Sequence, residues 1–433
     1  MIETKKEAEK TVLVFFAKKD DNVVKIKESL EELELLSTTA GAKVVKTFYQ
    51  IGESFDSRYM IGKGKAEEIA NYVEEKEISL VIFENELSFT QLRNLEQKIK
   101  CKILDKSNLI LDIFAKNART SQAKLQVELA QLEYLLPRLT RQWTHLSKQY
   151  GGIGTKGPGE TQIETDRRLI KTRISVLKEK LEKIDRQRRT QALERKNYIR
   201  LSLVGYTNAG KSTLLNLLTD SDVYVEDKLF ATLDTSTRML KLNSAKVKKI
   251  VSRFPKKVLI SDTVGFIKNL PHNLIESFKS TLSEVVESDI LLHLIDISNP
   301  NFEEQISVVK DTLDEIGAGG RKIVNVFNKV DKLNDFELLN HLKEEHPDSV
   351  FMSAQKGLNV EFLLNKVKEE LSKEYIEKTI RLKKDNYKLL NKIYKLAEVI
   401  EVGYLKTFTK VTVRGTKENL DFIEKLIYAN IKI

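Results

Sequence analysis

Hydrophobic and polar positions along this chain change their spacing at several points, and these changes divide it into four stretches. Over residues 1–116, short apolar runs alternate with helical patterns, and strands are predicted at residues 12–16, 43–50, 80–83 and 102–105. The strand pattern disappears over residues 117–198 and returns over residues 199–373. Residues 374–433 predict a strand, a helix, an alternating strand at 406–414 and a last helix. The pattern therefore indicates three α/β units with a helical stretch after the first.

The helical stretch, residues 117–198, carries two sets of leucine and isoleucine side chains at spacings of three and four. They are Leu125, Leu129, Leu132, Leu136 and Leu139, and then Ile170, Ile174, Leu177, Leu181 and Ile184. Each set forms an apolar seam, which predicts an antiparallel hairpin that projects from the body as an arm. We expect Pro137 to kink or end the first helix. The joining loop, residues 151–159, is rich in glycine, so we expect a partner to order it.

A phosphate-binding loop follows the strand predicted at residues 199–204 and leads into a helix. The loop and the first helical residues are Gly205, Tyr206, Thr207, Asn208, Ala209, Gly210, Lys211, Ser212 and Thr213. In such a loop backbone N–H groups close around the β-phosphate. We expect Lys211 to reach the β- and γ-oxygens and the Ser212 hydroxyl to ligate Mg²⁺.

Two further segments carry the features of a nucleotide-dependent switch. The strand predicted at residues 258–261 leads into Asp262, Thr263, Val264 and Gly265. We expect Asp262 to hold the Mg²⁺ hydration shell and the Gly265 N–H to sense the γ-phosphate. The second segment is Phe230, Ala231, Thr232, Leu233 and Asp234. Its Thr232 hydroxyl is the second expected Mg²⁺ ligand, which loss of the γ-phosphate releases.

The base is predicted to be guanine. Asn328, Lys329, Val330 and Asp331 follow the strand predicted at residues 322–327, and Asp331 can accept hydrogen bonds from the guanine ring N–H and amino group. Adenine has no equivalent pair of donors, so GTP is preferred over ATP. Ser353, Ala354 and Gln355 follow the strand predicted at residues 350–352, and a backbone N–H there closes over the base. Residues 199–373 therefore predict a doubly wound P-loop GTPase domain.

Two positions bear on the rate of hydrolysis. Phe266 stands where many GTPases place the glutamine that orients the attacking water, so we expect slow turnover that a partner stimulates. Asn208 stands where some cation-activated GTPases coordinate K⁺. The alternative is that Asn208 caps local backbone, and the sequence favours neither. The candidate catalytic residues are Lys211, Thr232, Gly265 and Asn208.

Composition adds a class of partner. The 433 residues carry a net charge of +10, which favours polyanions such as RNA. Cations and aromatic side chains suited to RNA gather around the tip of the arm: Arg138, Arg141, Trp143, His145, Lys148, Tyr150, Lys156, Arg167, Arg168, Lys171 and Arg173. We expect a cytoplasmic protein, because no signal peptide or membrane span is visible, and we also expect a monomer. The single cysteine, Cys101, excludes an internal disulfide framework.

The residues 157–168, which read GPGETQIETDRR, resemble a hallmark of the HflX family of ribosome-associated GTPases. Similar matches are residues 61–65, 205–212, 230–234, 262–267 and 270–272, so the resemblance covers most of the chain. It implies a factor that binds the large ribosomal subunit and its RNA, inserts the arm near the peptidyl transferase centre, and splits stalled or idle ribosomes. Residues 243–255 depart from the family because they are longer and more basic than its usual hairpin.

Two other functions remain open from the residues alone. The chain can be an RNA-binding ribosome-assembly factor that uses GTP hydrolysis for release, or a scaffold whose hairpin pairs with a second copy under nucleotide control. The sequence also leaves open whether Gly62, Lys63 and Gly64, which open a predicted helix, hold a second nucleotide or only form a turn. For the last unit, residues 374–433, packing against the GTPase domain is the favoured expectation.

Overall fold

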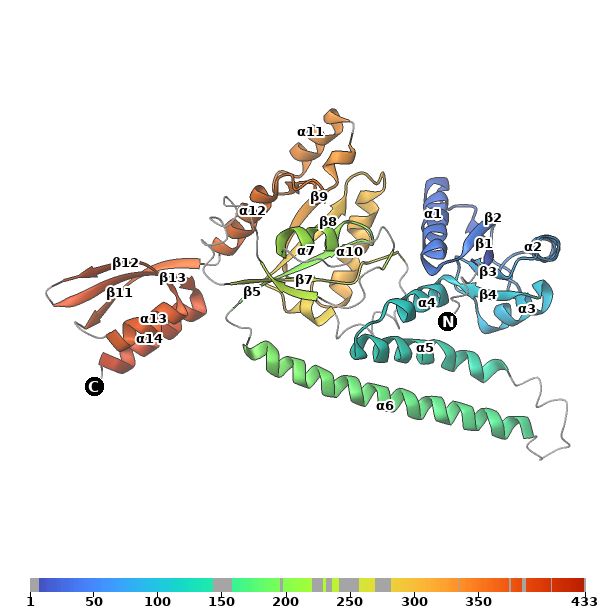
Figure 1. The fold of residues 1–433 in the computed structure, drawn as a ribbon, viewed down its shortest axis with the longest axis horizontal. Helices are drawn as coiled ribbons and strands as arrows, with labels where there is room; N and C mark the ends of the chain where they lie inside the picture. The colour runs from blue at the N-terminus through green and yellow to red at the C-terminus, as the bar shows by residue number, and fades with distance from the viewer. Residues whose placement is uncertain are drawn as a thin grey trace, which may run out of the picture.

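The computed structural model describes residues 8–142, 158–194, 198–219, 229–230, 236–240, 257–268, 282–333, 335–373, 375–383, 387–405 and 407–431. It contains a four-stranded, a six-stranded and a three-stranded sheet, with a pair of long helices beside the first two (Figure 1). The predicted α/β fold class is confirmed. None of the helices in these ranges is long and apolar enough to cross a membrane.

The first sheet is parallel and has helices on both faces. Its strands are β1 (Lys10–Lys18), β2 (Lys43–Gly52), β3 (Leu80–Phe83) and β4 (Lys102–Asp105), in the order β2-β1-β3-β4. Helices α1 (Val23–Ala40) and α4 (Lys106–Asn117) pack on one face, while α2 (Lys63–Lys76) and α3 (Phe89–Ile99) pack on the other. The central strands are buried on both faces, which explains their continuous apolar runs.

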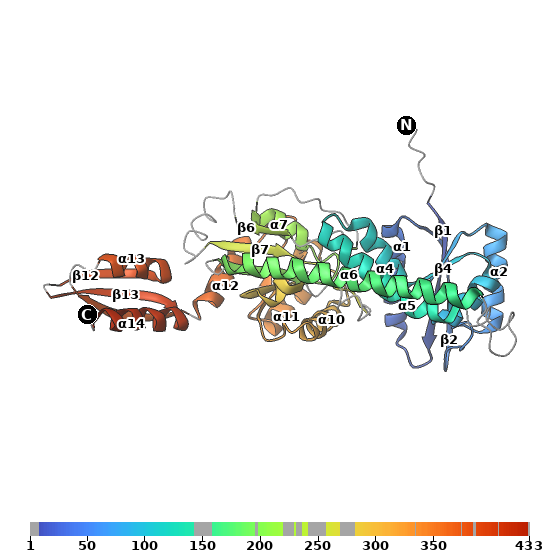
Figure 2. The ribbon, with the colours of Figure 1, turned by 90° about the horizontal axis from the view of Figure 1, so that it is seen from below.

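The two long helices, α5 (Ser121–Gln142) and α6 (Pro158–Glu194), lie side by side in both ribbon views (Figures 1 and 2). Leu129, Leu177 and Leu181 are buried in their shared seam. The expected projection of the arm is wrong for its described part. Ala123 and Val127 of α5 belong to the same buried cluster as α4, so the arm lies along the N-terminal unit.

Pro137 lies inside α5. The helix does not end there but continues to Gln142, so of the two expected effects, a kink or an end, the end is wrong. The Arg138 guanidinium donates to the Tyr134 carbonyl one turn back at 2.9 Å. Pro158 and Gly159 begin α6, so the predicted loop ends two residues early, in keeping with the preference of proline for the first helical turn. Residues 151–157 lie outside the described ranges.

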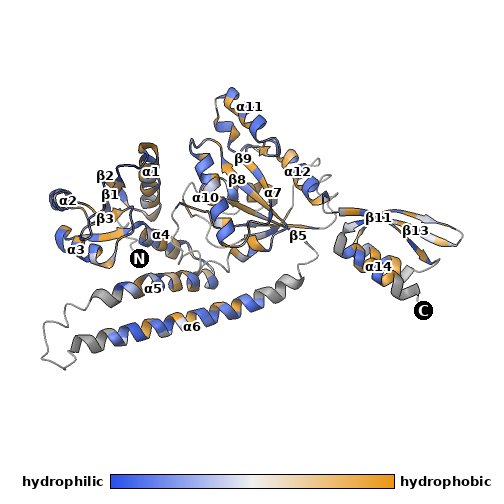
Figure 3. Cartoon of the chain, turned by 180° about the vertical axis from the view of Figure 1, so that it is seen from behind, coloured by the Kyte–Doolittle hydropathy of each residue, from blue (hydrophilic) through white to orange (hydrophobic). Residues whose placement is uncertain are grey.

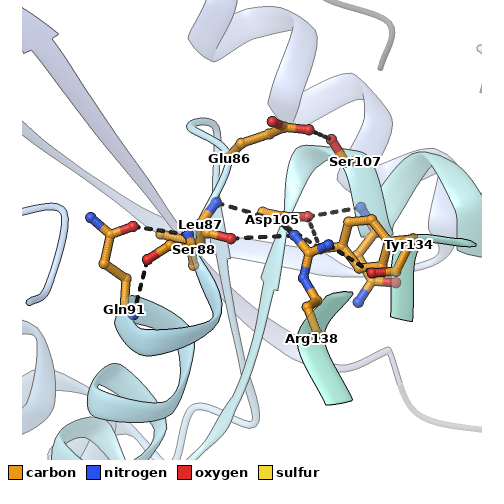
Figure 4. A network of polar contacts seen from close by, with 9 residues as sticks. Glu86, Leu87, Ser88, Gln91, Asp105, Ser107, Tyr134 and Arg138 are labelled. Carbon is orange, nitrogen blue, oxygen red and sulfur yellow. Dashed lines mark hydrogen bonds and ion pairs between the residues drawn. The ribbon is translucent and has the colours of Figure 1, made fainter. Parts of the chain in front are cut away.

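A buried polar cluster fixes α5 to the end of β4 (Figure 4). The Tyr134 hydroxyl donates to Asp105, lying 2.7 Å from each carboxylate oxygen, and Arg138 pairs with the same carboxylate at 3.3 Å. Backbone N–H groups of Asn108 and Leu87 donate to it at 2.9 and 3.3 Å. Asp105 is only 2% exposed, so these bonds compensate the cost of burying its charge.

The second sheet has the order β10-β9-β8-β5-β7-β6, and only β6 runs antiparallel to its neighbour. The strands are β5 (Ile199–Gly205), β6 (Ser236–Met239), β7 (Val258–Asp262), β8 (Ile290–Asp296), β9 (Lys322–Asn328) and β10 (Val350–Phe351). The helices are α7 (Lys211–Thr219), α10 (Phe302–Glu315), α11 (Phe336–Glu345) and α12 (Val360–Ser372). Figure 3 shows the hydrophobic residues concentrated on the central strands.

The last unit corrects one expectation about its strands. Its elements are β11 (Tyr375–Lys383), α13 (Tyr387–Leu396), β12 (Glu398–Tyr404), β13 (Phe408–Thr416) and α14 (Lys417–Ile431). Two strands therefore stand where one was expected. Its buried cluster, as far as the described residues go, contains only side chains of this unit.

Candidate nucleotide site

The predicted site residues gather at one edge of the six-stranded sheet. Gly205, Asp262, Asp296 and Asn328 are the last residues of four neighbouring parallel strands, β5, β7, β8 and β9. The strand order reverses at β5, which pairs with β7 on one side and β8 on the other. Open α/β sheets bind ligands at this point because the loops after the strands diverge there and leave a crevice.

The loop after β5 takes a conformation that requires its two glycines. Gly205 has φ +151°, and a Cβ there would lie 2.3 Å from the Leu294 carbonyl oxygen. Gly210 has φ +94°, and its Cβ would lie 2.4 Å from the Asn328 side-chain nitrogen. Side chains at either position would collide with neighbouring atoms as well as strain the backbone. The spacing of glycines read from the sequence therefore reflects a real steric demand.

Lys211 is held over this loop. It is 7% exposed, and its ammonium donates to the carbonyl oxygens of Gly205 and Tyr206 at 3.0 and 2.8 Å. Burial lowers the Lys211 pKa to about 8, and the charge of Asp262 opposes this effect. A phosphate arriving beside the ammonium would favour its charged form. The Thr207 hydroxyl, which has no hydrogen-bond partner among the described residues, is a second buried group available to a phosphate.

The residues expected around magnesium fit that ion. The Ser212 hydroxyl donates to a carboxylate oxygen of Asp262 at 2.6 Å, and Asp262 is fully buried. A hydroxyl and a buried carboxylate beside a phosphate loop are hard oxygen donors, and Mg²⁺ uses one or two of these together with phosphate and water. The other expected ligand, Thr232, lies outside the described residues together with Ala231, Leu233 and Asp234. Residues 243–255 and 270–272 lie outside as well.

The loop that carries Gly265 lies directly on the phosphate loop. The Thr207 N–H donates to the Phe266 carbonyl at 2.8 Å, and the Phe266 N–H donates to the Gly205 carbonyl at 3.1 Å. A Cβ on Gly265 would lie 2.9 Å from Thr207 Cα and 3.1 Å from the Lys211 nitrogen. Phe266 is 2% exposed, so its ring belongs to the core.

Asn328 connects the loops expected around the base. Its side-chain nitrogen donates to the Ala209 carbonyl, and its side-chain oxygen accepts from the Ala354 N–H, both at 2.9 Å. The neighbouring Lys329 has φ +65° and pairs with Asp296 at 2.6 Å. Asp331 is exposed in a short 3₁₀ helix, Val330–Lys332, at the same edge. The residues expected around the base thus lie together, and the Asp331 carboxylate is accessible.

Several contacts of this site were not predicted. Asp296 follows an apolar strand in the same way as Asp262 does, and that pattern was available in the sequence. Phe230 packs edge-on against Phe114 of α4, with ring centroids 4.7 Å apart, and Asn117 donates to the Phe230 carbonyl at 2.9 Å. The second pair joins segments 113 residues apart, so no local pattern could have indicated it.

This fold, with a phosphate loop at its switch point and a base-recognition motif beside it, defines a P-loop GTPase. Family descriptions match in series: "GTP-binding GTPase N-terminal" at residues 27–115, "GTP-binding GTPase Middle Region" at 117–195 and "50S ribosome-binding GTPase" at 200–329. The chain belongs to the HflX family of GTPases, as its resemblance predicted.

Two relatives illustrate the similarity. A GTPase HflX of Flavobacterium psychrophilum is 51% identical over 75% of this chain and 76% of its own length. A GTPase HflX of Escherichia coli is 43% identical over 86% of each chain. A solved GTP-binding protein from Sulfolobus solfataricus, in complex with GDP, is 29% identical and covers 84% of this chain and 100% of its own. The TM-score between the two structures is 0.44.

Proposed function

We propose that this GTPase binds the large ribosomal subunit and its RNA in the GTP state and splits stalled or idle ribosomes. The observation that carries the proposal is the match of residues 200–329 to the family described as a 50S ribosome-binding GTPase. The charge supports it, because the net charge of +10 favours RNA. Arg167, Arg168 and Lys171 are also exposed near the start of α6, where the arm turns. Trp143, His145, Lys148, Tyr150 and Lys156 lie outside the described residues.

Each residue of the phosphate site has a proposed role. Lys211 neutralises the β- and γ-oxygens, Ser212 and Thr232 ligate Mg²⁺, and Asp262 holds the hydration shell of the ion. Mg²⁺ held by these residues would supply positive charge beside the phosphates. The Gly265 N–H detects the γ-phosphate. The close packing of Lys211, Ser212 and Asp262 supports this division, because these groups already face one another without further rearrangement of the sheet.

Base selection is proposed for the motif that Asn328 holds together. Its two hydrogen bonds fix the loops of Ala209 and Ala354 relative to each other, and the Lys329–Asp296 pair fixes the adjacent turn. Asp331 accepts the guanine ring N–H and amino group, and a backbone N–H of the loop 353–355 meets the base. This arrangement supports GTP over ATP as the substrate.

Hydrolysis is proposed to be slow without the ribosome. The buried phenyl ring of Phe266 can neither donate nor accept the hydrogen bond that orients water in many GTPases. Asn208 lies in the phosphate loop with a left-handed backbone conformation, φ +62°, and we propose that it binds K⁺ beside the phosphates. Equal hydrolysis rates in K⁺ and Na⁺ would remove the K⁺ proposal and leave Asn208 as a backbone cap.

The main test is cosedimentation with large ribosomal subunits in GDP and in a non-hydrolysable GTP analogue, at several salt concentrations. We expect binding in the GTP state, and we expect Arg167→Gln with Arg168→Gln to reduce the slope of log affinity against log salt by about 2. The matched control is Lys180→Gln, an exposed cation further along α6. Binding that ignores nucleotide would contradict the proposal.

Splitting needs its own assay. Addition of the protein and GTP to 70S ribosomes should convert them to free subunits in a sucrose gradient, and GDP should not. Accumulation of precursor subunits in cells that lack the protein, with 70S ribosomes unaffected in the gradient, would instead favour an assembly factor. We further propose four units, at residues 1–116, 117–198, 199–373 and 374–433, that act in the cytoplasm as a monomer.

A further inference from the structure

The side chain of Tyr206, the second residue of the phosphate loop, contacts two other parts of the chain. Its hydroxyl donates to the Glu32 carboxylate of α1. The same oxygen accepts the Lys268 N–H at 2.9 Å. Lys268 follows the loop that carries Gly265, and its ammonium pairs with Glu304 of α10 at 2.7 Å. One phenol therefore joins the phosphate loop, the γ-phosphate-sensing loop and the N-terminal unit.

The carboxylate that receives this hydrogen bond is firmly placed. Glu32 pairs with the Lys106 ammonium at 2.8 Å, and Lys106 also pairs with Glu84 at 3.4 Å. The Lys106 side chain is 4% exposed, and those of Glu32 and Glu84 are 14% and 8% exposed. Such low exposure leaves little water to compete for these bonds. Burial first, and the charge of Glu32 second, raise the pKa of Tyr206, so the phenol remains a donor at neutral pH.

The backbone beside Tyr206 shows what this contact holds in place. Gly205, Thr207 and Phe266 form two backbone hydrogen bonds that join the two loops like adjacent strands. Gly265 then lies so close to Thr207 and Lys211 that an added Cβ would meet both at 3.1 Å or less. A γ-phosphate has to contact the Lys211 ammonium and the Gly265 N–H at once, and the two backbone hydrogen bonds restrict how far the Gly265 loop can move to admit it.

We propose that the Tyr206 hydroxyl is a latch that holds the Gly265 loop in the position that excludes the γ-phosphate, so that GTP, unlike GDP, must release it. The latch deepens the proposed roles of Lys211 and Gly265. Tyr206 is a positioning residue here, since its hydroxyl acts through the Lys268 backbone and not on the phosphates. A cavity of about 270 Å³ adjoins the ring, lined by Glu28, Glu32, Asn208 and Lys268, and gives the side chain room to turn when the latch opens.

Tyr206→Phe tests the latch because it keeps the ring and removes both hydrogen bonds. The closed state loses its stabilisation, so we expect affinity for a fluorescent GTP analogue to rise about tenfold relative to the matching GDP analogue. Glu32→Gln removes the charge at the other end of the contact, and it should raise the ratio of GTP-analogue to GDP-analogue affinity by a smaller factor. Because Glu32 lies on a separate helix, Glu32→Gln tests the latch if Tyr206→Phe does not fold.

Two controls isolate the latch. Glu31→Gln changes the neighbouring carboxylate, which faces the same cavity but pairs at the surface with Lys27, and it should leave the ratio unchanged. The double variant of Tyr206 and Glu32 should equal Tyr206→Phe alone, since both changes remove one contact. Wild-type protein that binds neither analogue would indicate failure of the nucleotide site, which is distinguishable from failure of the latch.

Hydrogen exchange distinguishes the latch from a role of Tyr206 in overall stability alone, because only the latch predicts faster exchange confined to the Gly265 loop. The amides of Phe266 and Lys268 donate to Gly205 and Tyr206 in the latched state. In the GDP state, Tyr206→Phe should speed exchange in the peptide that spans residues 262–268 and leave α12 unchanged. A ratio of GTP to GDP affinity that stays constant or falls in Tyr206→Phe, or unchanged exchange at these amides, overturns the proposal.

Discussion

Gly210→Ala tests whether the shape of the phosphate loop sets nucleotide affinity. The added methyl group meets two obstacles: φ is +94°, and the Cβ would lie 2.4 Å from the Asn328 side-chain nitrogen. The backbone strain costs roughly 1–2 kcal/mol. Moving Asn328 disturbs its bonds to Ala209 and Ala354, at a further cost of roughly 1–3 kcal/mol. If the free loop relaxes and must take up the strained shape again to bind GDP, these terms together oppose binding by about 2–5 kcal/mol, which is roughly a 30- to 4,000-fold loss of GDP affinity.

Two other glycines separate the effect of backbone strain from the effect of a steric collision. Gly317, just past α10, has φ +80° but no atom within 4 Å of a Cβ, so Gly317→Ala carries backbone strain without a collision. Gly320 has open space and no positive φ, so Gly320→Ala carries neither. Fluorescent GDP titration and thermal unfolding should show a lower melting temperature for Gly317→Ala with unchanged affinity. If Gly210→Ala binds GDP as tightly as Gly317→Ala does, the steric account of the loop is wrong.

Three shorter predictions concern pH, the base and the arm. The pKa of Lys211 without nucleotide is about 8, and a bound phosphate raises it, so nucleotide binding takes up a proton. Nucleotide affinity should therefore fall as the pH rises above about 8. Calorimetry near pH 8.5 in two buffers of different ionisation enthalpy measures this proton uptake, and its absence would contradict the prediction. Asp331→Asn should weaken GTP at least tenfold and favour xanthosine triphosphate, because an amide can donate to the xanthine 2-carbonyl; unchanged GTP affinity would argue against the proposed base contact. Tyr134→Phe removes a donor from buried Asp105 and should cost about 1.5–3 kcal/mol. Unfolding monitored by hydrogen exchange of α5 should show this loss, whereas Tyr49→Phe, at a residue that is 61% exposed, should differ from wild type by less than about 0.5 kcal/mol.

Local patterns identified much of this fold before any coordinates. The strand at residues 80–83 is an apolar run in the middle of a parallel sheet, and its limits agree with those predicted. The phosphate loop could also be predicted from the sequence, because a Cβ at Gly205 or Gly210 would collide with Leu294 or Asn328, so these positions require glycine. Such features depend on a few consecutive residues, so the sequence alone expresses them.

Other features depend on contacts between distant segments and were missed. Strand β12 was overlooked because its register shifts between Val399 and Glu401, which interrupts the alternation of a regular strand. The contact of Glu32 with Tyr206 joins residues 174 positions apart, and no local pattern distinguishes Glu32 from the other glutamates of its helix. The expected end of α5 at Pro137 was also wrong, because the helix continues to Gln142 and places Arg138 against the Tyr134 and Leu87 carbonyls.

Asp105 and Lys106 are consecutive residues, but they bind different parts of the chain. Asp105 accepts a hydrogen bond from Tyr134 and pairs with Arg138 on α5. Lys106 pairs with Glu32, which accepts a hydrogen bond from Tyr206. Two adjacent residues therefore connect the later half of α5 to the phosphate loop. A movement of α5 that displaces Asp105 would also displace Lys106, and with it the glutamate that accepts from Tyr206.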